Sequence, residues 1–66
     1  MTIVCNGEPR EIAAEMTVAA LIDLLGLNPR QVAVEVNLDV VPRVRHATHV
    51  LQAGDRVELV TLVGGG

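Results

Sequence analysis

The fold is decided by the run Val57-Glu58-Leu59-Val60-Thr61-Leu62-Val63, which Gly64-Gly65-Gly66 follows directly. The run is rich in strand-forming residues and predicts a β-strand. Alternation along that strand points Val57, Leu59 and Thr61 to one face and Glu58, Val60 and Leu62 to the other. Glycine has no Cβ, so the three residues after the strand can enter narrow channels that are closed to other residues. We therefore expect a rigid strand that delivers a flexible tail.

A second apolar run, Met1 to Cys5, lies at the other end of the sequence. Asn6-Gly7 follows it and is a strong hairpin signal, because both residues tolerate a positive φ. The return strand is expected from Glu8 to Ala13, with Pro9 on an edge strand, where a missing N–H is tolerated. We expect the two apolar runs to lie side by side and parallel in the centre of a sheet, since the segment between them is long enough for a crossover.

One helix is expected after the hairpin. Thr17 is a candidate N-cap, and Gly26 and Pro29 are suited to end the helix. One apolar stripe recurs at helical spacing and consists of Val18, Leu21, Ile22 and Leu25. A helix of about two turns is marginal alone, so a sheet must cover its stripe.

The rest of the chain predicts further strands. Val32 to Val36 alternates, with its three valines inward and Ala33 and Glu35 outward, and Asn37-Leu38-Asp39 turns into a short strand at Val40-Val41. Residues 43–52 should form a loop with one irregular helical turn, and Ala53-Gly54-Asp55 a tight turn. This order predicts an α+β fold of the β-grasp type, with a mixed sheet of about four or five strands and the helix on one face. Residues 1–63 should form this domain and residues 64–66 the tail.

Composition restricts the possible partners. The chain has 66 residues, a net charge of −3, five basic residues and no aromatic residue. The negative charge and the lack of stacking side chains disfavour nucleic acid and anionic membranes and favour a partner with a basic face. We expect no signal peptide and no membrane span, because no basic leader or long apolar stretch is present. Cys5 is the single cysteine, which excludes an internal disulfide and favours the cytoplasm.

The sequence contains no catalytic constellation. It has no serine, its carboxylates are scattered, and its terminal glycines lack the lysine and helix of a phosphate-binding loop. Cys5 is interpreted as a small core residue. His46 and His49 are three apart, but nothing completes a metal site, so we expect surface histidines and no bound metal. Val60 and Leu62, exposed beside the tail, predict a docking patch for a partner. The chain should be a carrier or a substrate and not an enzyme.

Several stretches resemble the ThiS family of small sulfur carriers, which have a ubiquitin-like β-grasp fold. They are Val32-Ala33-Val34-Glu35-Val36-Asn37, Val41-Pro42-Arg43, Leu51 with Gly54-Asp55-Arg56-Val57-Glu58, and Val63-Gly64-Gly65-Gly66. The resemblance covers essentially the whole chain. It implies that the Gly66 carboxylate is adenylated with ATP by an E1-like adenylyltransferase of the ThiF type and then converted to a thiocarboxylate. Gly64 and Gly65 would thread the partner's channel.

The resemblance also implies the remaining partners. The sulfur would come from cysteine through a desulfurase, and a thiazole synthase of the ThiG type would receive it for thiamine biosynthesis. No stably bound cofactor is implied, since ATP is used by the adenylyltransferase. Three alternatives stay open: a molybdopterin-type sulfur carrier, a ubiquitin-like modifier conjugated to lysines, and a ubiquitin-like binding module with an inert tail.

Overall fold

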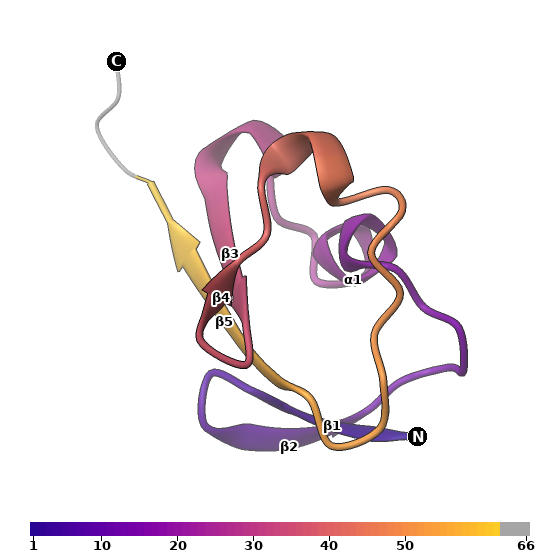
Figure 1. Cartoon of the computed structure of the whole chain (residues 1–66). Helices are drawn as coiled ribbons and strands as arrows, with labels where there is room; N and C mark the ends of the chain where they lie inside the picture. The colour runs from indigo at the N-terminus through magenta and orange to yellow at the C-terminus, as the bar shows by residue number, and fades with distance from the viewer. Residues whose placement is uncertain (63–66) are drawn as a thin grey trace.

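The computed structural model describes residues 1–62, in which a five-stranded sheet carries one α-helix across one face (Figure 1). In chain order the strands are β1 (Thr2–Cys5), β2 (Glu8–Glu11), β3 (Val32–Val36), β4 (Asp39–Val40) and β5 (Arg56–Thr61). The helix α1 spans Val18–Leu24, and two 3-10 turns, η1 (Pro29–Gln31) and η2 (Arg43–Arg45), lie in the connections. The predicted α+β class, with the helix on one face, is confirmed.

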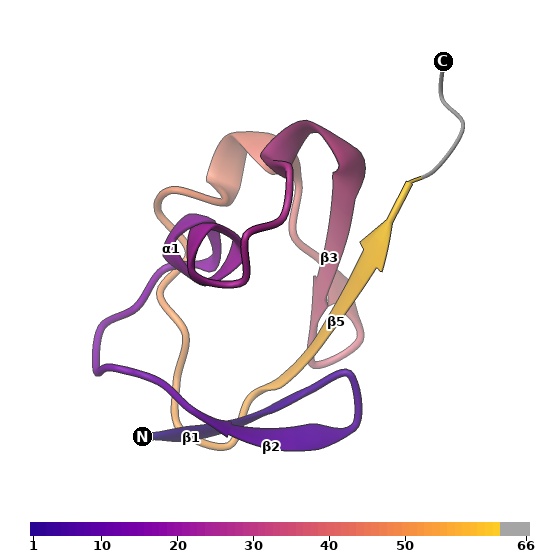
Figure 2. The same ribbon diagram turned by 180° about the vertical axis from the view of Figure 1, so that it is seen from behind.

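The sheet order is β2-β1-β5-β3-β4, so β5 is the central strand (Figure 2). β1 and β5 run parallel and pair at Val4–Arg56 and Cys5–Val57, while the β1–β2, β3–β4 and β3–β5 pairs are antiparallel. The expected parallel contact between the first and last strands is therefore confirmed. This is the β-grasp arrangement, in which the central strand pairs with the first hairpin and a crossover helix packs on one face of the sheet.

The β1–β2 hairpin turns at Asn6 and Gly7, whose φ angles are 50° and 82°. The return strand ends at Glu11, two residues earlier than expected. Ile12 exchanges two hydrogen bonds with Met1: its N–H donates to the Met1 carbonyl and its carbonyl accepts from the Met1 ammonium, each at 2.8 Å. The Ile12 side chain is buried in the core.

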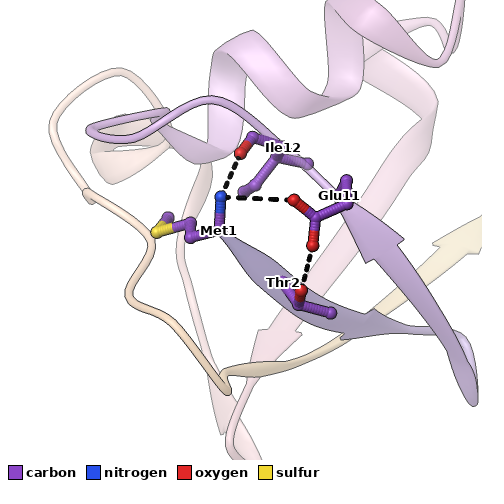
Figure 3. A network of polar contacts seen from close by, with 4 residues as sticks. All are labelled: Met1, Thr2, Glu11 and Ile12. Carbon is purple, nitrogen blue, oxygen red and sulfur yellow. Dashed lines mark hydrogen bonds and ion pairs between the residues drawn. The ribbon is translucent and has the colours of Figure 1, made fainter.

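Figure 3 shows the polar contacts that hold the start of β1 against the end of β2. The Met1 ammonium lies 3.6 Å from one Glu11 carboxylate oxygen, and the Thr2 hydroxyl donates a hydrogen bond to the other. Both contacts favour the ionised carboxylate. They place the pKa of Glu11 below its ordinary value, with the Thr2 hydrogen bond as the larger cause and the ammonium charge as the next.

The helix begins and ends where the sequence predicts. The Thr17 hydroxyl accepts from the Ala20 N–H at 3.1 Å, and Gly26 follows the last turn with a φ of 71°. Val18, Leu21 and Ile22 are fully buried against the sheet. Because only seven residues are helical, this burial and not helix propensity holds the segment.

The core is entirely aliphatic. It consists of Ile3, Ile12, Val18, Leu21, Ile22, Val32, Val34, Val36, Val41, Leu51, Val57 and Leu59. Every strand except β2 and β4 contributes to it, and the three β3 valines point inward as predicted. Within residues 1–62, no helix has both the length and the apolar character needed to cross a membrane.

The short strand after β3 is Asp39–Val40, one residue earlier than predicted. Asn37 and Leu38 both have positive φ, 53° and 74°, so these two residues alone form the turn and Asp39 already pairs with Val36. Val41 then leaves the strand and is buried, with its N–H donating to the Val34 carbonyl at 2.9 Å.

The loop after β4 contains the irregular helical turn that the sequence predicts, but the surface location expected for its histidines is wrong for His46. That side chain is only 5% exposed, and its Nε2 lies 2.9 Å from the Val41 carbonyl. The carbonyls of His46 and His49 accept hydrogen bonds from the Ala19 and Val18 N–H groups at the start of α1. These bonds draw the loop against the helix and bury the imidazole, while His49 stays partly exposed.

Candidate functional site

The candidate site is the end of β5, where the chain leaves the sheet. Thr61 of β5 is opposite Val32 of β3, and the Leu62 N–H donates to the Gln31 carbonyl of η1 at 2.6 Å, so β3 and η1 together hold the chain up to its last described residue. Gly64, Gly65 and Gly66 lie outside the described residues, and the roles predicted for them stay predictions. What the structure supplies is the strand β5, which ends at Thr61, three residues before Gly64.

The predicted exposure of Val60 and Leu62 is confirmed. Their side chains are 57% and 53% exposed, whereas Val57 and Leu59 are buried under α1. Ala33 lies opposite Val60 and is also exposed, and its small side chain leaves Val60 uncovered. The docking role of Val60 and Leu62 is not tested by their exposure and stays a prediction.

Two carboxylates meet on the sheet face that points away from α1, which we call the open face. The register sets Glu35 of β3 directly opposite Glu58 of β5, and Val40 of β4 opposite Glu35. Like charges in this position repel each other. Neither glutamate forms an ion pair with another described residue. The open face therefore combines exposed apolar side chains with uncompensated negative charge, which suits a partner with basic groups.

Sequence reasoning treated these carboxylates as scattered and missed the pair. The signal was present, since alternation already placed Glu35 and Glu58 on the outward faces of their strands. Only the register of β3 against β5 makes them neighbours, and register is a long-range property.

A polar contact that sequence reasoning also missed supports β5 on its other side. The Asn6 side chain accepts from the Leu59 N–H at 2.7 Å and donates to the Leu59 carbonyl at 3.2 Å. The amide thus replaces the backbone of a paired strand just beyond the end of β1. It satisfies the backbone of Leu59 beyond the point where the pairing of β5 with β1 stops.

Cys5 does not have the surroundings of a nucleophile. Its side chain is half-buried and packs against the core, and this burial raises the pKa of its thiol. The Arg10 guanidinium opposes that shift and Glu58 reinforces it, but burial is the largest cause and the pKa stays above its ordinary value. The thiol is therefore protonated at neutral pH. Residues 1–62 also bring together no three side chains of His, Cys, Asp or Glu as a metal site.

These features define a class: a ubiquitin-like β-grasp domain whose central strand ends beside exposed apolar side chains. The model of the ThiS family matches residues 3–66. The sulfur carrier protein ThiS of Escherichia coli K12 is 33% identical over 66 residues, which cover all of both chains. The crystal structure of the thiamine biosynthesis protein ThiS from Geobacter metallireducens superposes with a TM-score of 0.86 at 30% identity, covering all of both chains. The chain belongs to the ThiS family.

A second kind of relative is longer. The thiazole synthase of Paramagnetospirillum magneticum is 47% identical over 66 residues, and that of Magnetococcus marinus 44%. The chain spans a fifth of the length of these two proteins. In both, a segment that is homologous to the whole chain is part of a protein named for thiazole formation.

Proposed function

We propose that the chain is a sulfur carrier of thiamine biosynthesis and not a catalyst. The observation that carries the proposal is the family match over residues 3–66, which takes in the strand β5 and the three terminal glycines. The end-to-end similarity to the sulfur carrier of Escherichia coli supports it. The carried group would be a thiocarboxylate at Gly66.

The chemistry at Gly66 follows from the properties of a carboxylate. With an ordinary pKa of about 3.5 it is ionised at neutral pH, so it is a nucleophile but a poor electrophile. Attack of a carboxylate oxygen on the α-phosphorus of ATP gives an acyl adenylate and releases pyrophosphate. The terminal sulfur of a persulfide then displaces AMP, and a thiol cleaves the resulting S–S bond to leave the thiocarboxylate. The adenylyltransferase consumes the ATP, and the carrier itself needs no stably bound cofactor.

We propose three partners for this cycle. An E1-like adenylyltransferase activates Gly66, a cysteine desulfurase supplies the persulfide sulfur, and a thiazole synthase accepts the sulfur. The relatives named thiazole synthase support the last partner, because they contain the carrier-like segment in the same chain. The cytoplasm is the proposed compartment, since the cycle depends on ATP and a reduced thiol.

Docking and threading would be divided between two parts of the chain. Val60 and Leu62 on the open face would contact the adenylyltransferase, with Glu58 facing basic groups. Gly64 and Gly65 would pass through a channel too narrow for a Cβ, which brings Gly66 to the nucleotide.

The proposal is tested by pyrophosphate exchange into ATP, with the adenylyltransferase and the full chain. Exchange should require the chain and should disappear when Gly66 is deleted. Val60→Asp should weaken exchange about tenfold or more by burying an unpaired charge in the interface. Val44→Asp makes the same change at another exposed valine, on η2, and should leave exchange unchanged. Exchange that survives deletion of Gly66 would contradict the proposed function.

A further inference from the structure

β5 pairs with β3 along one edge up to Thr61, but its other edge pairs with β1 only near the start of the strand. The Asn37 N–H donates to the Arg56 carbonyl at 2.7 Å, and the Leu62 N–H donates to the Gln31 carbonyl at 2.6 Å. Backbone groups alternate in direction along a strand, so the even-numbered residues of β5 point their N–H and C=O groups toward β3. The odd-numbered residues Val57, Leu59 and Thr61 therefore point theirs toward the side of β1.

On that side the pairing stops before the strand does. The Val57 carbonyl accepts from the Asn6 N–H at 2.9 Å, and the Asn6 amide satisfies Leu59. Thr61 comes next, and within the described residues neither its N–H nor its carbonyl has a hydrogen-bond partner. Figure 2 shows the same arrangement: the hairpin of β1 and β2 borders only the lower part of β5, and the upper part has β3 on one side alone.

The two outer strands of the sheet, β2 and β4, are protected against pairing with another strand, whereas the free edge of β5 at Thr61 is not. β2 has the sequence Glu-Pro-Arg-Glu, and a proline with charged neighbours prevents another strand from pairing. β4 is only two residues long. At Thr61 the neighbours are Val60 and Leu62, without a charge or a proline. An uncharged, unprotected strand edge is a template for the addition of another strand.

We propose that an extended strand of the enzyme that activates Gly66 pairs with β5 at Thr61 and adds a sixth strand locally to the sheet. This inference rests on the proposed function. Gly66 is five residues beyond Thr61, so the activating site must lie within roughly 17 Å of this edge. Pairing at Thr61 fixes the direction in which the tail leaves the sheet. The open-face side chains beside the added strand are Glu58, Val60 and Leu62, which suit apolar and basic groups on the partner.

The test compares Thr61→Pro with Thr61→Ala in titrations of the adenylyltransferase with the full chain. Proline removes the N–H that an added strand needs, whereas alanine keeps it. We expect Thr61→Pro to weaken binding about tenfold and Thr61→Ala to weaken it less than about threefold. Because no acceptor among residues 1–62 binds the Thr61 N–H, we expect Thr61→Pro to fold. Val60→Pro removes an N–H that points toward β3 and should unfold the domain.

Amide hydrogen exchange gives a second readout that needs no variant. In the free chain the Thr61 amide should exchange fast and the Val60 amide slowly, and the enzyme should protect Thr61. Equal binding by Thr61→Pro and Thr61→Ala, or no added protection of Thr61 in the complex, would overturn the inference while adenylation of the wild-type chain continues. Failure of the wild-type chain to be adenylated would overturn the proposed function and this inference together.

Discussion

At the scale of single residues, Asp55 connects two loops that frame the start of β5. It is 8% exposed, and its carboxylate oxygens accept from the Asn37 side chain at 3.0 Å and from the Gln52 N–H at 2.8 Å. The Asn37 side-chain oxygen in turn accepts from the Arg56 N–H at 2.9 Å. These bonds fix the turn between β3 and β4 against the loop that leads into β5.

Replacing Asp55 with Ala should therefore destabilise the domain. The Asn37 side-chain amide and the Gln52 N–H lose their acceptor, and because both hydrogen bonds are only partly buried the cost should be about 1–2 kcal/mol. Urea unfolding measures the change in the free energy of unfolding. Asp39→Ala is a matched control at an exposed position and should change it by less than about 0.5 kcal/mol. Equal stabilities of the two variants would contradict the role given to Asp55.

Glu11 should make the stability of the domain depend on acid pH. Its folded-state pKa lies below the ordinary value of 4.5, mainly because of the Thr2 hydroxyl and then because of the Met1 ammonium. A lowered carboxyl pKa contributes stability that is present above the unfolded-state pKa and is lost as the pH falls through the folded-state pKa. The wild type should therefore be more stable than Glu11→Gln at neutral pH. This difference should disappear once the pH falls below the folded-state pKa of Glu11.

The Glu11 prediction is checked by thermal unfolding midpoints, measured from neutral pH down to below the folded-state pKa of Glu11. Thr2→Val removes the largest cause of the shift, so it should reduce the pH dependence but retain the part due to the ammonium. A constant difference between wild type and Glu11→Gln from neutral to acid pH would show that the two contacts do not favour the ionised carboxylate.

At the scale of elements, Asn6 supports the central strand where β1 ends. Asn6→Gly keeps a residue that tolerates the φ of 50° but removes both hydrogen bonds to Leu59. We expect a loss of about 1–2 kcal/mol in the free energy of unfolding. The Leu59 amide should also exchange faster with solvent, while the amide of Val36, which pairs with Asp39 in the β3–β4 hairpin, serves as an internal reference. An unchanged Leu59 exchange rate would contradict the contact.

The elements themselves could largely be predicted from the sequence. Alternation in β3 and β5, the Asn6-Gly7 turn and the Thr17 cap are local signals, and the structure has each of them. Apart from small shifts in the bounds of β2 and β4, the features that were not predicted depend on distant contacts. His46 is buried by hydrogen bonds between its loop and the start of α1, and the Glu35–Glu58 pair exists only through the β3–β5 register. No local pattern in the sequence contains either contact.

At the scale of the whole molecule, the fold supports one central strand on both sides and leaves the side chains near its end exposed. β5 is supported by β3, by β1 and by Asn6, and it ends beside the exposed Val60 and Leu62. The net charge of −3 includes the two facing glutamates on the open face. This arrangement suits a carrier, since a partner can bind the sheet firmly and still act on a carboxylate beyond it.

Gly65→Ala should separate threading from folding. The added methyl group obstructs the proposed channel, so adenylation by the partner should slow about tenfold or more. The domain should keep its thermal unfolding midpoint, because residue 65 lies outside the described sheet, helix and core. Normal adenylation kinetics for this variant would remove the threading role of the tail.

Sulfur transfer to the chain is tested most directly by its intact mass after incubation with the adenylyltransferase, ATP and a persulfide donor. We expect a mass increase equal to the replacement of one oxygen by sulfur, which tandem fragmentation places on Gly66 and which is absent from a chain lacking that residue. An unchanged mass, with an adenylyltransferase known to be active, would contradict the central claim that this chain carries sulfur.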